Sequence, residues 1–170
     1  MQTIECILTR RSIRKFETGK TVSDEIIKAM LRAAMQAPSA GNQQVWNFIV
    51  VTDRKILEEI PKFHPHSQML KEAPLAIVVC GDTNIEKYEG YWVQDCSAAA
   101  QNILLAAHDK GLGAVWLGVH PVEEREEALK KLLLLPDGVI PLGIIAAGYA
   151  AQKIEPADRY DETKIHYNKW

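Results

Sequence analysis

Apolar residues recur at helical spacing along several stretches of the chain. Residues 24–37 carry one apolar stripe and follow Ser23, a good capping residue, so they predict a helix that ends at Pro38. Residues 91–110 form the longest helical stretch, and their alanine runs permit close approach of a neighbouring helix. Residues 121–135 are acidic early and basic late, as the helix dipole prefers. Shorter helices are predicted at residues 4–8 and 54–60.

Four short apolar runs between these helices have the length of strands. They are residues 48–51, 75–80, 114–117 and 139–147. The run 75–80 is unbroken, which predicts a strand buried on both faces. Helices and strands alternate irregularly, without an internal repeat or a linker. We therefore expect residues 1–170 to form one domain built in layers.

The composition changes abruptly after Gly148. The segment 153–170 is polar, yet it carries large side chains that favour burial, namely Tyr160, Ile165, Tyr167 and Trp170. It cannot form a core of its own. We expect residues 148–170 to be an extension that docks either on the body of the chain or on a second subunit.

Composition and charge argue against several classes of protein. A hydrophobic share of 47% and a charged share of 25% are typical of a soluble globular protein. The net charge of -2 gives no support to nucleic-acid binding, and no apolar run approaches the length of a membrane span. No signal peptide is visible, and three widely spaced cysteines fit a reducing cytosol better than a disulfide framework. We expect a cytoplasmic protein with no membrane or nucleic-acid partner.

A cationic cluster at residues 10–16 is the first candidate for chemistry. Four of these seven residues are Arg or Lys, in a chain that is close to neutral overall. Arg10 and Arg14 match phosphate oxygens with paired donors, and Ser12 adds a hydroxyl group. The cluster thus suggests a local anionic ligand. From these residues alone, a solvated basic turn remains the alternative.

The segment 37–46 is the second candidate. Its small residues let a flat ligand approach the backbone closely. Asn42, Gln43 and Gln44 offer uncharged hydrogen-bond donors and acceptors, and Trp46 is expected to form an aromatic wall. A polar loop between a helix and a strand is an equally good interpretation of these residues.

The remaining histidines, cysteines and acidic residues predict neither a metal site nor a catalytic triad. A surface or lid role is expected for His64, His66, His108 and His120, which lack the spacing of metal ligands. The residues predicted to fill the core as small side chains are Cys6, Cys80 and Cys96. Asp95 either orders neighbouring side chains or lies on the surface.

Both candidate segments, together with later motifs, resemble the FMN-dependent nitroreductase family. The motifs, in order, are Arg10-Arg11-Ser12-Ile13-Arg14-Lys15-Phe16, residues 37–42 with Trp46, Trp92-x-x-Asp95-Cys96-Ser97-Ala98-Ala99, residues 111–118, Gly148-Tyr149 and Asp158-Arg159-Tyr160. The resemblance covers essentially the whole chain. It implies an α+β, three-layer fold with helices flanking a mostly antiparallel central sheet. It also implies a homodimer with FMN at the interface and a C-terminal tail, residues 148–170, exchanged between subunits.

The resemblance assigns cofactor contacts along the chain. Arg10 and Ser12 would contact the phosphate and ribityl chain with Arg11 nearby, and Arg14 would lie by flavin N1 and the C2 carbonyl. Lys153 and Arg159 would complete the phosphate site, and Leu117 and Gly118 would lie near N5 through their backbone amides. The other subunit would contribute Pro38, Ser39, Ala40 and Asn42.

The implied activity is that of an NAD(P)H-dependent FMN oxidoreductase. NADH or NADPH would reduce FMN and leave, and a nitroaromatic, quinone or related acceptor would then take the electrons in a ping-pong cycle. No catalytic acid or base is expected, since a hydride arriving at flavin N5 needs none. The alternative is a protein that stores or delivers FMN without significant turnover. Because segments 62–72 and 82–90 are short, we expect an open acceptor pocket.

Overall fold

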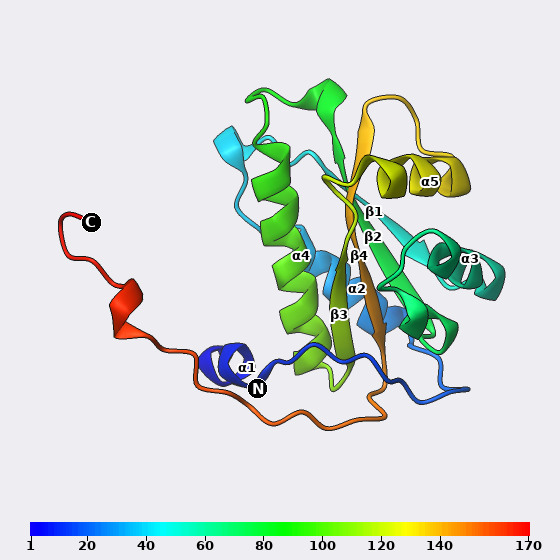
Figure 1. The fold of residues 1–170 in the computed structure, drawn as a ribbon, viewed down its shortest axis with the longest axis horizontal. Coiled ribbons are helices and arrows are strands. Elements are labelled where there is room, and N and C mark those ends of the chain that lie inside the picture. The colour runs from blue at the N-terminus through cyan, green and yellow to red at the C-terminus, as the bar shows by residue number, and fades with distance from the viewer.

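An antiparallel sheet of four strands, in the order β1-β2-β4-β3, lies at the centre of the computed structural model, which describes residues 1–170 (Figure 1). The strands are β1 (Trp46–Val51), β2 (Leu75–Asp82), β3 (Gly113–Gly118) and β4 (Val139–Gly148). Every pairing is antiparallel, which confirms the predicted α+β class and the antiparallel central sheet.

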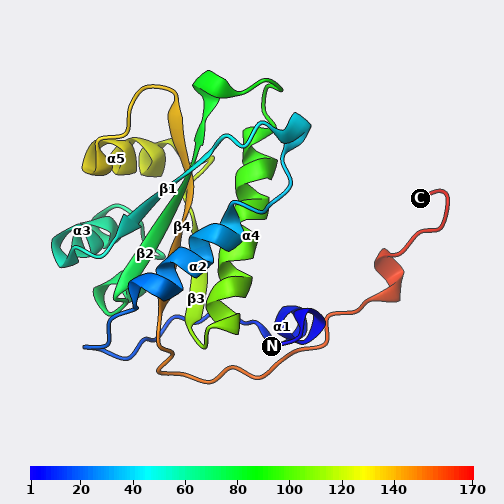
Figure 2. The same ribbon diagram turned by 180° about the vertical axis from the view of Figure 1, so that it is seen from behind.

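Five α-helices flank this sheet. They are α1 (Thr3–Thr9), α2 (Asp24–Ala34), α3 (Arg54–Glu59), α4 (Trp92–Asp109) and α5 (Glu123–Leu133). Helices α2 and α4 cover one face, whereas α3 and α5 lie on the other, as the two opposite views show (Figures 1 and 2). The arrangement is the predicted one of three layers.

Strand β2 supplies both hydrophobic cores. Successive side chains of a strand point to opposite faces. Leu75, Ile77 and Val79 therefore join the cluster beneath α2 and α4, and the intervening Ala76 and Val78 join the cluster beneath α3 and α5. All five are fully buried, so the prediction of a strand covered on both faces is confirmed.

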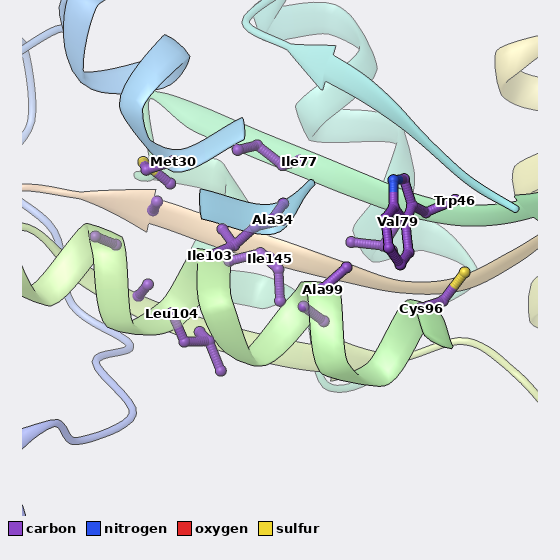
Figure 3. Packing of buried hydrophobic residues seen from close by; sticks show 14 of the residues in the cluster. Met30, Ala34, Trp46, Ile77, Val79, Cys96, Ala99, Ile103, Leu104 and Ile145 are labelled. Carbon is purple, nitrogen blue, oxygen red and sulfur yellow. The ribbon is translucent and has the colours of Figure 1, made fainter. Parts of the chain in front are cut away.

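The core beneath α4 depends on small side chains. Ala99 is fully buried and faces Val79 and Ile145 across the helix–sheet contact (Figure 3). Met30 and Ala34 of α2 fill the neighbouring space and are also fully buried. The alanines of α4 thus allow the helix to approach both the sheet and α2 closely, as the sequence predicts.

Several predicted boundaries shift at proline and glycine. Regular α2 ends at Ala34, three residues earlier than predicted, because its last turn tightens into 3₁₀-type bonds from Gln36 N to Ala33 O and from Ala37 N to Ala34 O before Pro38. Regular α3 ends at Glu59, one residue before its predicted end, and Pro61 lies in the first positions of the 3₁₀ turn Ile60–Lys62, where its missing N–H leaves no helical bond unmade. Gly111, at φ +78°, ends α4, whereas Gly113 belongs to β3, where a Cβ would meet Ile13 at 2.6 Å.

The basic segment 10–16 joins the two strand ends at one edge of the sheet. Ser12 forms a parallel bridge with Ala114, and Ile13 N donates to Ala114 O at 3.0 Å. Phe16 bridges Ala150 just beyond β4. The segment is consequently fixed against the start of β3 and the end of β4.

The C-terminal tail leaves the body past α1 (Figure 1). Its aromatic side chains remain exposed: Tyr160 at 71%, Tyr167 at 84% and Trp170 at 101%. Residues 160–170 therefore do not dock on the body of their own chain, the first of the two expected alternatives. Docking on a second subunit stays a prediction. No helix here combines the length and the apolar character that crossing a bilayer requires.

Candidate functional site

Three arginines from opposite ends of the chain meet in one pocket. Arg10, the residue after α1, and Arg11 line a pocket of about 550 Å³ together with Arg159 of the tail. Arg11 brings the tail there, because its guanidinium group donates to Glu155 O at 3.3 Å and to Ala157 O at 3.0 Å. The structure thus brings together two of the predicted phosphate ligands, Arg10 and Arg159, with Arg11, which was expected nearby.

The charge of these arginines is not balanced by the protein. Neither Arg10, Arg11 nor Arg159 forms an ion pair with a carboxylate. Burial lowers the pKa of Arg10 below its ordinary value, and the charges of Arg11 and Arg159 lower it further. The nearby Asp158 accepts from Tyr160 N at 3.0 Å in a local turn. An anion in this pocket would relieve the repulsion, so the pocket suits a phosphate group.

The other predicted phosphate-side residues occupy different positions. Ser12 is half-buried beside β3, and Arg14 is exposed. Lys153 lies at a neighbouring pocket of about 320 Å³, which it shares with Arg11 but not with Arg10. Its ammonium group pairs with Glu155 at 2.7 Å. Lys153 is therefore the one predicted phosphate ligand that already has a partner and stands apart from Arg10.

The second candidate segment forms a loop by the first turns of α4. Pro38, Ser39 and Ala40 line a pocket of about 370 Å³ with Asp95 and neighbouring residues of α4. Asn42 follows in the left-handed region at φ 55°, where few residues other than glycine are found. Four predicted site residues, Pro38, Ser39, Ala40 and Asn42, are thus grouped here.

Asp95 orders this loop from beneath. It is 3% exposed, and its Oδ1 accepts from Ala40 N at 2.9 Å. Its Oδ2 accepts from Gln43 Nε2 at 2.7 Å. Of the two roles left open for Asp95, the ordering role is confirmed and the surface role is wrong. The expectation that Gln43 offers free donors and acceptors is wrong too, because its amide is buried and already bonded.

Two aromatic side chains differ from expectation. Trp46 is not an open wall of the site: it is 8% exposed and packs into the core beneath α4 (Figure 3). His64 is not on the surface, since it is only 1% exposed. Its Nε2 lies 2.8 Å from Gly118 O, and Arg125 donates to the same oxygen at 3.0 Å. Burial lowers the pKa of His64. Both side chains are held by partners distant in sequence.

Leu117 and Gly118 lie at the end of β3 opposite to the basic segment. Leu117 is buried and Gly118 is exposed. Gly118 lies five positions after Gly113, which corresponds to about 17 Å of extended strand. Within one chain these two residues and the arginine pocket are therefore at different ends of the sheet edge.

The arginine pocket and the loop at residues 38–42 lie at opposite ends of α4. Asp95, which holds the loop, is on the first turn of the helix. His108, whose pKa is lowered by burial and next by the charge of Arg10, is on its last turn. Their thirteen-residue separation corresponds to about 20 Å along the axis. One chain keeps the two groups of predicted site residues apart (Figure 1).

Comparison with known proteins gives a consistent result. A family model described as "Nitroreductase family" matches residues 7–66 and 61–149. A protein of Methanothermobacter thermautotrophicus strain Delta H, provisionally named NADH dehydrogenase/NAD(P)H nitroreductase, is 51% identical over 170 residues, which is 100% of this chain and 88% of that protein.

Solved structures agree with the sequence comparison. A Parabacteroides distasonis protein with the same provisional name superposes with a TM-score of 0.96 at 47% identity, covering 100% of this chain and 99% of the other. An FMN-dependent nitroreductase of Clostridium difficile R20291 gives a TM-score of 0.91 at 31% identity, with 99% and 100% of the two chains covered.

Proposed function

This chain belongs to the nitroreductase family, and from that premise we propose that it is an NAD(P)H-dependent FMN oxidoreductase. The Methanothermobacter relative is named for NAD(P)H, and the C. difficile structure is named for FMN. The observation that carries the proposal is the pocket in which Arg10, Arg11 and Arg159 meet without forming an ion pair, although Asp158 also lines it. A dianionic phosphate is the ligand that such a pocket favours.

The residues of the pocket fit the phosphate end of FMN. The three arginines would hold its oxygens, and the hydroxyl group of Ser12 lies on the same segment. Arg14 is exposed two residues further on, and as a cation near flavin N1 it would stabilise negative charge there. Lys153 would have to leave Glu155 before it could contribute. Bound FMN supplies the hydride-transfer chemistry, and the protein binds and orients it.

We infer that two copies of the chain complete each site. Because the arginine pocket and the loop at residues 38–42 lie at opposite ends of α4, a second copy is needed to place Pro38, Ser39, Ala40 and Asn42 against the ring system. Leu117 and Gly118 are proposed to line the ring through backbone amides. Residues 148–170 would cross to the partner, which would cover the exposed Tyr167 and Trp170.

The proposed reaction is a ping-pong cycle. NADH or NADPH delivers a hydride and leaves, and a nitroaromatic or quinone acceptor then binds in the same place. The pockets at the three arginines, at Lys153 and at residues 38–40 all open onto the surface of the chain. An open acceptor pocket remains part of this proposal. Residues 1–170 would act as one domain.

A spectrum and a turnover assay test the proposal. The purified protein is expected to be yellow, or to become so on addition of FMN, and to oxidise NADH or NADPH faster when menadione or a nitrofuran is present. A yellow protein with no acceptor-dependent rate would support FMN storage instead. A colourless protein that does not bind FMN would refute both functions.

A further inference from the structure

A buried polar bridge joins three segments on one side of the molecule. Asp95 of α4 binds the backbone of Ala40 and the side chain of Gln43, as described above. Gln43 is 8% exposed, and its Oε1 accepts from Lys87 N at 2.9 Å and from Tyr88 N at 3.2 Å. The bridge therefore links the loop at residues 38–44 both to α4 and to the segment before that helix.

The backbone groups around this bridge determine which atoms of Asp95 and Gln43 donate and which accept. Ala40, Lys87 and Tyr88 present backbone N–H groups, which can only donate. Gln43 must turn its oxygen toward Lys87 and Tyr88, so its NH₂ group faces Asp95. Both oxygens of Asp95 must then be acceptors, and no cation pairs with this carboxylate.

The loop that the bridge holds has an unfavourable backbone. Gly41, Asn42 and Gln44 all have positive φ, at 51°, 55° and 51°. Residues other than glycine adopt this region at a cost and keep it only where surrounding contacts impose it. The ring of Tyr88 lies directly on Gly41, where an added Cβ would come within 2.2 Å of it. Bonds within the loop, such as Gln44 N to Ser39 Oγ at 3.1 Å, shape its turn, whereas the bridge ties the loop to α4 and to the segment that carries Tyr88.

We propose that Asp95 and Gln43 are positioning residues that hold the loop at residues 38–42 and Tyr88 as one rigid unit for the flavin site of a second copy of the chain. The inference rests on the proposed function. The bridge touches no part of the arginine pocket, so its contribution to FMN binding is made through the loop alone.

Exchanging the two polar groups tests the bridge directly. Asp95→Asn places an NH₂ group against another donor in every orientation of the two amides. Gln43→Glu places two carboxylates at the 2.7 Å contact. The double variant, which combines both substitutions, restores every bond. Its amide at position 95 accepts from Ala40 N and donates to the carboxylate at position 43, and that carboxylate accepts from Lys87 N and Tyr88 N.

Two readouts separate this inference from the proposed function. Amide hydrogen exchange of the cofactor-free protein reports on Ala40, Lys87 and Tyr88 without any flavin. Both single variants are expected to lose protection there, and the double variant to regain it. FMN affinity, followed by quenching of flavin fluorescence, is expected to fall about tenfold or more in each single variant and to return to within about threefold in the double variant.

Asn102→Ala is the matched control. Its amide also ties α4 to a neighbouring helix, donating to Ala33 O of α2 at 2.9 Å, and it lies about 10 Å further along α4 than Asp95. This variant should leave FMN affinity and the hydrogen-exchange protection of the three amides unchanged.

Unaltered FMN affinity in both single variants, or a double variant that binds FMN no better than either single variant, would overturn the inference. If Asp95→Asn fails to fold, Gln43→Glu and Gln43→Leu give the same decision. Failure of the unmodified protein to bind FMN would refute the proposed function instead.

Discussion

Replacing Arg10 with methionine should change stability and cofactor affinity in opposite directions. The substitution removes the guanidinium group and keeps most of the apolar stem, so little packing is lost. In the cofactor-free protein Arg10 is half-buried and carries no ion pair, and its pKa is lowered first by this burial and then by repulsion from Arg11 and Arg159. Its removal therefore relieves an unfavourable interaction in the folded state.

The two effects have different magnitudes. Interactions between exposed charges are worth about 0.2–1 kcal/mol each, so losing two repulsive contacts should stabilise the cofactor-free protein by about 0.5–1 kcal/mol. For a chain of this size that corresponds to a rise in Tm of about 1–4 °C. A hydrogen bond to a charged group contributes about 1.5–3 kcal/mol, so Kd for FMN should increase about 10-fold to 150-fold.

Thermal unfolding of the cofactor-free protein and a fluorescence titration with FMN measure the two changes. The gain in Tm should shrink at high salt, which screens the repulsion. Arg32→Met is the control, since Arg32 is exposed in the last turn of α2 and has no ion pair: it should leave FMN affinity unchanged and should not raise Tm, because a cation there stabilises the helix dipole. A lower Tm combined with unchanged FMN affinity in Arg10→Met would refute the reasoning.

Three further predictions concern other parts of the site. Arg14→Ala should lower the midpoint potential of bound FMN, measured by dye-linked reduction, because a cation near N1 is lost; an unchanged potential would remove its assigned role. The unfolded chain takes up a proton at His64 before the folded protein does, so unfolding free energy should decrease as the pH falls below 6.5. His64→Gln keeps a hydrogen-bond donor toward Gly118 and has no titrating ring. Its unfolding free energy, measured by urea titration at several pH values, should therefore decrease less as the pH falls. Co-expressed Arg10→Ala and Asp95→Asn chains should recover tight FMN binding in about half the sites of mixed dimers; no recovery would show that each chain builds its own site.

The layers of the fold could be predicted because they depend on local patterns. The unbroken apolar run of β2 and the alanine-rich stripe of α4 each identify an element and the faces that it buries. The boundary at Pro38 was less accurate, since proline excludes some conformations without determining which turn replaces them.

The site was only partly predictable. The cationic cluster at residues 10–16 indicated an anionic ligand, but nothing local places Arg159 beside it; that expectation came from the resemblance alone. The burial of His64 and Gln43 cannot be predicted from the local sequence, because each side chain is held by a partner distant in the chain. Those partners are Gly118, 54 residues from His64, and Asp95, 52 residues from Gln43.

The length of α4 has a consequence for how this chain can change. Its two ends carry the two groups of residues that separate subunits are proposed to combine, so the helix acts as a spacer of fixed length. Inserting or deleting one residue within it would turn one end by about 100° relative to the other and shift it by about 1.5 Å. Substitutions along α4 can accumulate one at a time, whereas a change in its residue number would misalign both shared sites of a dimer at once.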